Sequence, residues 1–213
     1  MPTATVGRMI KVRSSIRIPL ATTEAQMPAE ITRRLFDVDD YHRMAEAGIL
    51  SEDDRVELID GEIIAMTPIG PRHNAAVNRA NRALVTVIGD HAIVQVQGSV
   101  RLDQFREPQP DIVLLRPQPD FYASRLPGPS DILLIIEIAE SSLAYDRDVK
   151  ARIYAQSAVP EYWLVDLDDR SVSCYSEPRD GTYQTLRQLR MGLSLAPGAL
   201  PQCAIPVDVL LAD

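Results

Sequence analysis

The sequence predicts an α/β (α+β) protein in which a mixed β-sheet lies between helices. Residues 110–117 (PDIVLLRP) and 131–140 (DILLIIEIAE) are nearly continuous apolar runs, the type found in strands that are covered on both faces. Residues 73–89 place apolar side chains at helical spacing, and a further helix is expected over residues 144–158. Helices and strands that alternate in this order are typical of a sheet packed between helices.

Size and charge limit the class of protein. The chain has 213 residues, which is enough for one large domain with a buried core. Its formal net charge of −8 argues against a broadly basic surface, on which non-specific affinity for nucleic acid depends. It does not exclude a local basic channel. Aromatic residues make up only 5%, so a stacking platform for single strands is not expected.

The domain organisation is expected to be simple. Residues 1–34 look like a flexible N-terminal arm without the apolar core of a signal peptide, and residues 35–213 form a single domain. No run approaches the roughly 20 apolar residues of a membrane span. Cys174 and Cys203 lie far apart, which favours free thiols in a reducing cytoplasm over the alternative of one disulfide.

The remaining elements follow from local patterns. Asp37 can cap a helix that Gly48 ends, and Asp60-Gly61 is a strong hairpin turn with Glu57 on its first arm and Glu62 just after it. Residues 92–102 alternate as a half-buried strand does, and residues 118–130 are a loop. Ser141 or Ser142 is the expected cap of the helix over 144–158. Further strands are expected at 161–169, 171–178 and 183–189, and residues 194–213 form an irregular wrap with a short apolar anchor.

Two acidic residues accompany the apolar strands. Asp111 opens the first run and Glu137 lies inside the second. A buried carboxylate costs several kcal/mol unless it is paired, hydrogen-bonded or bound to metal. If the two strands are neighbours in suitable register, both carboxylates meet, and a divalent cation such as Mg²⁺ would relieve their repulsion. Such an ion activates water and clamps a scissile phosphate.

A basic partner for this acidic pair is expected from the next helix. Ala139 shares the strand face of Glu137, and a lysine at that position would place the attacking water, but the chain has alanine. Lys150 lies in the following helix, from which a long side chain could reach the same cleft. There it would orient the water or neutralise developing charge.

These motifs together resemble a known family. The segments RVELIDGEI, PRHNAAVN, PD before an apolar strand, EIAESS, DRDVKARIYA and VPEYWLVDLDD are similar to the Uma-two family of restriction-endonuclease-like proteins, over about residues 36–211. That family belongs to the PD-(D/E)XK nuclease superfamily. The resemblance implies a restriction-endonuclease-like fold and metal-dependent cleavage of phosphodiester bonds.

The resemblance also implies roles for individual residues. Asp111 and Glu137 match the metal ligands, for Mg²⁺ or Mn²⁺. Lys150 matches the lysine thought to replace the one missing at position 139, and Glu57 matches a third acidic group. Two further positions, His73 and Gln95, could contact metal-bound water or phosphate. Nucleic acid is the implied partner, with DNA expected, and a homodimer is implied because superfamily nucleases often dimerise; the apolar tail over 194–211 could form the dimer contact.

Ordinary structural roles compete with each assignment. Asp111 could cap a strand, Glu137 could lie exposed at an edge or pair with an arginine, and Lys150 could form a surface pair with Asp146. The remaining alternatives are a solvated Glu57, a capping or packing His73, a polar strand face at Gln95, core positions for Tyr154 and Trp163, and a solvated acidic turn at Asp166, Asp168 and Asp169.

Three functions remain open at this point. The first is a nuclease. The second is a catalytically silent binding or assembly module on the same scaffold, which the alanine at position 139 and the net acidity favour, since a fold does not dictate a function. The third is a metal-dependent enzyme that acts on a smaller phosphorylated substrate.

Overall fold

A computed structural model describes residues 32–51 and 53–212. The chain divides into two units, Met1–Arg33 and Arg34–Asp213. The arm expected over residues 1–34 lies outside the described residues, except for positions 32–34. Every described helix and strand belongs to the second unit.

The predicted mixed sheet is confirmed, and it has six strands in the order β3-β4-β5-β6-β7-β8. Neighbouring strands are antiparallel except β5 and β6, which are parallel. Strands β4 and β5 are buried along their whole length, as their continuous apolar sequences predict. The strands are β3 (Ile93–Val96), β4 (Ile112–Leu115), β5 (Ile132–Ala139), β6 (Glu161–Asp166), β7 (Ser171–Arg179) and β8 (Thr182–Arg190).

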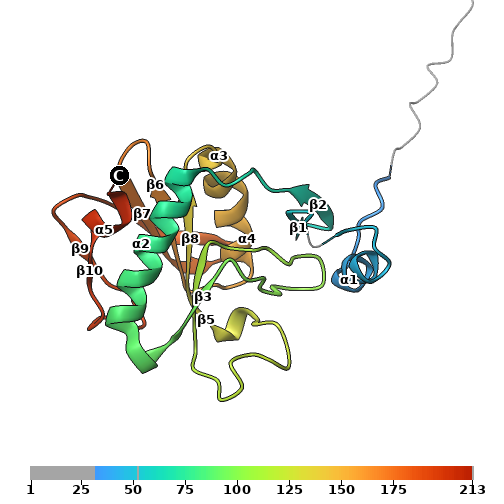
Figure 1. Cartoon of the computed structure of the whole chain (residues 1–213), viewed down its shortest axis with the longest axis horizontal. Coiled ribbons are helices and arrows are strands. Elements are labelled where there is room, and N and C mark those ends of the chain that lie inside the picture. Colours follow the sequence, from blue (N-terminus) through green and yellow to red (C-terminus); the bar gives the residue numbers. More distant parts are fainter. Residues whose placement is uncertain (1–31, 52, 213) are drawn as a thin grey trace, which may run out of the picture. The chain divides into compact units, whose positions relative to one another are not determined.

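Helices cover both faces of this sheet (Figure 1). On one face, the apolar stripe of α2 (Pro71–Ile88) packs with α5 (Val207–Leu211) against Leu134, Ile136 and Ile138 of β5. On the other face, α4 (Ala151–Gln156) packs against Ile135 and Ala139. The side chains of β5 therefore alternate between two cores, so Glu137 and Ala139 face the α4 side, as strand alternation predicts.

Smaller elements surround this framework. Asp37 caps α1 (Val38–Glu46), since its side chain accepts a hydrogen bond from Asp40 N at 2.7 Å. Asp60-Gly61 joins β1 (Val56–Ile59) to β2 (Glu62–Ala65) as an antiparallel hairpin. The other short elements are 3₁₀ turns at Gly89–His91 and Pro129–Asp131 and the β9 (Ser194–Leu195) and β10 (Ile205–Pro206) pair. No helix among the described residues is long and apolar enough to span a membrane.

Two expected elements differ in the structure. The strand expected over 92–102 ends at Val96, because Gln97 adopts a left-handed φ of 48° that turns the backbone out of the strand. The helix expected over 144–158 is not continuous. It runs as α3 (Leu143–Tyr145), a π-helical turn (Asp146–Lys150) and α4. Ser142 stands at its N-terminus but makes no capping bond; its hydroxyl donates to Asp146 Oδ2 at 2.5 Å.

The apolar side chains of the C-terminal tail, residues 194–211, form part of the hydrophobic core. They pack under α2 and the sheet, where they are buried. The apolar part that was expected to form a dimer contact is therefore already covered within one chain. The buried residues are Leu195, Leu200, Cys203, Ile205, Val207, Leu210 and Leu211.

Candidate active site

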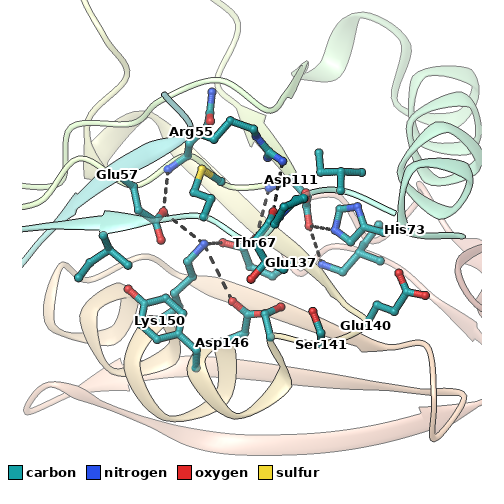
Figure 2. A pocket seen from close by; sticks show the side chains of 18 of the residues that line it. Arg55, Glu57, Thr67, His73, Asp111, Glu137, Glu140, Ser141, Asp146 and Lys150 are labelled. Carbon is teal, nitrogen blue, oxygen red and sulfur yellow. Dashed lines mark hydrogen bonds and ion pairs between the residues drawn. The ribbon is translucent and has the colours of Figure 1, made fainter. Parts of the chain in front are cut away.

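Strand register brings the two predicted carboxylates together. Ile112 pairs with Ile136 in the antiparallel β4–β5 ladder, so Asp111, one residue before β4, lies opposite Glu137. The backbone N–H of Asp111 donates to Glu137 Oε2 at 3.3 Å, and both residues line the same pocket (Figure 2). Glu137 is buried, with 4% exposure, and is neither an edge residue nor the partner of an arginine.

Lys150 reaches this pocket from the π-helical turn. Its ammonium lies 2.9 Å from Glu137 Oε1, 3.3 Å from Glu57 Oε2 and 4.0 Å from Asp146 Oδ1 (Figure 2). Lys150 and Asp146 are both buried, so they do not form the surface pair that was the alternative. The cluster instead consists of three buried carboxylates around one ammonium group.

Glu57 enters the pocket from the hairpin. It lies on β1 opposite Ile64 and is 3% exposed, so it is not the solvated hairpin residue that the alternative required. Besides Lys150, it accepts a hydrogen bond from Gln109 N at 3.3 Å. The hairpin thus supplies a third acid to the site.

His73 holds Asp111 from the first turn of α2. Its Nε2 donates to Asp111 Oδ2 at 3.0 Å, and the backbone N–H of Ile138 donates to the same oxygen at 2.9 Å. The hydrogen bond to Asp111 raises the pKa of His73 above its ordinary value, although burial acts the other way and is the largest influence. His73 therefore contacts a predicted metal ligand.

Gln95 is the one predicted site residue that the structure does not bring to the cluster. It is absent from the residues that line the described pocket, and its amide donates to Ser99 O at 3.3 Å. Gln97 lies nearer, with its Nε2 at 3.4 Å from Asp111 Oδ1. The left-handed conformation at Gln97, which alternation cannot predict, ends the regular strand between these two glutamines.

Two residues of the cluster were not predicted as site residues. Asp146 was considered only as a surface partner of Lys150, and Tyr154 only as a core aromatic. Tyr154 is fully buried, and its hydroxyl donates to Glu137 Oε1 at 2.7 Å. The spacing of Asp146 and Tyr154 from Lys150, four residues on either side, places all three on one helix face and is the signal that could have found them.

The pocket around these groups is a cavity of about 300 Å³. Burial raises the pKa of Glu137 to about 8, and the nearby carboxylates add to this while Lys150 opposes it. Burial alone would lower the pKa of Lys150, but the carboxylates of Glu137, Glu57 and Asp146 raise it above its ordinary value. The ammonium therefore stays charged, and the acidic groups around it exceed it in number.

This donor set fits a small hard cation. Asp111 Oδ1 and Glu137 Oε2 accept only long hydrogen bonds, of 3.4 and 3.3 Å, whereas the other oxygen of each carboxylate accepts shorter ones. Mg²⁺ is commonly held by one or two carboxylates and completes its shell with water and phosphate. Within residues 32–51 and 53–212, no group of three His, Cys, Asp or Glu side chains is arranged to hold a metal ion.

A family match and a similar solved structure both agree with the fold described above. The Uma2 family model, described as "Putative restriction endonuclease", matches residues 38–208. The chain is similar to a solved protein from Anabaena variabilis ATCC 29413, described as "a putative nuclease belonging to DUF820". The TM-score is 0.67 at 16% sequence identity, over 83% of this chain and 98% of that chain. At this identity the likeness concerns the fold. Among curated proteins, none gives a significant match.

Proposed function

Because the chain belongs to the Uma2 family, which is described as "Putative restriction endonuclease", we propose that it is a metal-dependent endonuclease that hydrolyses phosphodiester bonds of nucleic acid, with DNA as the expected substrate. One observation carries this proposal beyond the family. Asp111 and Glu137, from adjacent central strands, meet in one pocket that also contains Lys150.

Asp111 and Glu137 are the residues that would hold Mg²⁺ or Mn²⁺. Each carboxylate keeps one oxygen free of short hydrogen bonds, and the surplus of acids over Lys150 favours a bound cation. When bound, the ion lowers the pKa of its water and neutralises charge on the scissile phosphate. His73 keeps Asp111 oriented through Oδ2, which is the usual role of a group that hydrogen-bonds a ligand.

Lys150 would act through its charge. Its ammonium lies beside Glu137, and both residues line the pocket; from there it would orient an attacking water and stabilise negative charge that develops on phosphate. Glu57 draws the same ammonium toward the hairpin side, so it sets where that charge lies. Glu57 would thus be a third acidic residue of the catalytic site, and its effect on the reaction would come from the position that it gives the Lys150 ammonium.

Cleavage assays test the proposal. We expect the full chain to nick plasmid DNA in Mn²⁺ or Mg²⁺, with no cleavage in chelator or in Asp111→Asn. Single-stranded DNA, RNA and a small phosphate diester are offered in parallel to identify the substrate class. Hydrolysis of the small diester alone would support a smaller phosphorylated substrate, and wild-type protein that cleaves nothing offered would contradict an endonuclease.

A catalytically silent binding or assembly module is the second candidate. It is favoured by the fact that Lys150 is already held by carboxylates while position 139 carries alanine. For this candidate we expect retention of nucleic acid in a binding assay without any cleavage.

We propose a homodimer, which sedimentation would test, and its contact must lie elsewhere than on the buried apolar side chains of the tail. We also propose the cytoplasm, because Cys174 and Cys203 are both buried and free, as is usual in a reducing compartment.

A further inference from the structure

Tyr154 contacts the predicted metal ligand Glu137 from the helix that covers it. The residue lies on α4, and its side chain is fully buried. Its ring packs edge-on against Tyr162, with centroids 5.2 Å apart. Its hydroxyl donates to Glu137 Oε1 at 2.7 Å. The ring thus belongs to the core, while the hydroxyl contacts Glu137, which lines the pocket.

The two oxygens of Glu137 have different surroundings. Oε1 accepts short hydrogen bonds from Lys150 at 2.9 Å and from Tyr154. Oε2 accepts one long hydrogen bond, from Asp111 N at 3.3 Å. The carboxylate is therefore held by one oxygen, and the other lies on the side of Asp111.

Of the two donors, the Tyr154 hydroxyl is the more directional. The terminal torsion of a glutamate is soft and roughly two-fold, so the carboxylate needs a directional partner to stay in place. The Lys150 ammonium is shared with Glu57 and Asp146, and a flexible lysine stem can follow a carboxylate that rotates. A tyrosine hydroxyl has a single hydrogen to donate, and this one is carried by a ring that the core holds rigidly.

We propose that Tyr154 is a positioning residue that holds Glu137 by Oε1 and so presents Oε2 to a divalent cation shared with Asp111. This proposal rests on the proposed function, since it assumes that the pocket binds a metal ion. The residue that positions Glu137 would then lie on α4, and not on β4 or β5, the strands next to which or in which the two proposed ligands lie.

The test is Mn²⁺ binding to the full chain, measured by calorimetry on wild type, Tyr154→Phe and Tyr183→Phe. Tyr183 is the matched control, because its hydroxyl donates to a backbone carbonyl, Val159 O at 3.0 Å, and not to a carboxylate. We expect Mn²⁺ affinity to fall ~10-fold in Tyr154→Phe, as is typical when a partner of a metal ligand is removed, and to stay at the wild-type value in Tyr183→Phe. In cleavage assays, excess Mn²⁺ should restore the rate of Tyr154→Phe without a change in KM for nucleic acid.

The outcomes separate the two proposals. Wild-type affinity in Tyr154→Phe overturns the positioning role while leaving the proposed function intact. Wild-type protein that binds no Mn²⁺ overturns both. Thermal unfolding is followed in parallel, and a Tyr154→Phe protein without a cooperative transition also overturns the positioning role, because the hydroxyl would then serve the fold and not the ligand.

Discussion

At the scale of single residues, burial decides which side chains belong to the site. Asp111 and Glu137 could be predicted, because burying a carboxylate beside or within a strand as apolar as β4 or β5 costs free energy unless the group is paired, hydrogen-bonded or bound to a metal. Tyr154 was harder to predict, because a tyrosine in an apolar helix face is usually a core residue, and only its spacing of four residues from Lys150 points to the site. The family resemblance implied Gln95, and the nearer position of Gln97 could not be predicted because the left-handed conformation at position 97 has no signature in the alternating pattern.

Replacing Lys150 with methionine should destabilise the protein strongly. Glu57, Glu137 and Asp146 would lose their common buried counter-charge, and breaking a buried ion pair by removing one partner typically costs about 3–5 kcal/mol. We expect the free energy of unfolding in urea, without divalent metal, to fall by about that amount. Methionine keeps much of the lysine stem, so the loss reports the charge.

Arg147→Met is the matched control on the same helical segment. Arg147 pairs with Asp148 at 2.8 Å, and both side chains are largely exposed, so its removal should change the free energy of unfolding by less than about 1 kcal/mol. Equal effects of the two substitutions would mean that Lys150 is not the counter-charge of a buried acidic cluster.

At the scale of elements, two connections place the acids and the lysine. The Asp60-Gly61 turn, readily predicted from its residue pair, fixes the register of β1 and hence the position of Glu57. The π-helical turn at Asp146–Lys150 could not be predicted, because i→i+5 bonding has no distinct composition and its residues look like ordinary helix. π-Bulges are often found at functional sites, and this one carries Lys150 into the pocket.

Gly61→Ala tests whether the hairpin turn tolerates a side chain. Gly61 has a φ of +77°, and an added Cβ would lie 2.6 Å from Leu35 Cβ. Left-handed strain and overpacking together predict a loss of roughly 2–4 kcal/mol in the free energy of unfolding. Gly192→Ala is the control, since its φ is +84° with no atom within 4 Å of the added Cβ, and strain alone predicts about 1–2 kcal/mol. Equal losses in urea unfolding would contradict the close approach at Gly61.

At the scale of the whole domain, strand order explains why distant segments share one pocket. β4 and β5 are antiparallel neighbours, and β5 and β6 are parallel, so the chain between β5 and β6 must cross a face of the sheet. That crossing runs through α3 and α4 (Figure 1). It bears Lys150 and Tyr154, which both contact the side chain of Glu137. The order of helices and strands could be predicted from apolar patterns, whereas the convergence of Glu57 and His73 on this pocket depends on tertiary packing that local patterns do not encode.

The central claim is that Asp111 and Glu137 together hold one divalent ion, and calorimetric titration of the full chain with Mn²⁺ tests it most directly. We predict that wild-type protein binds Mn²⁺ at a single site and that Asp111→Asn and Glu137→Gln each lose this binding while retaining a cooperative unfolding transition. Binding that persists unchanged in both variants, or a wild-type protein that takes up neither Mn²⁺ nor Mg²⁺, would contradict the claim.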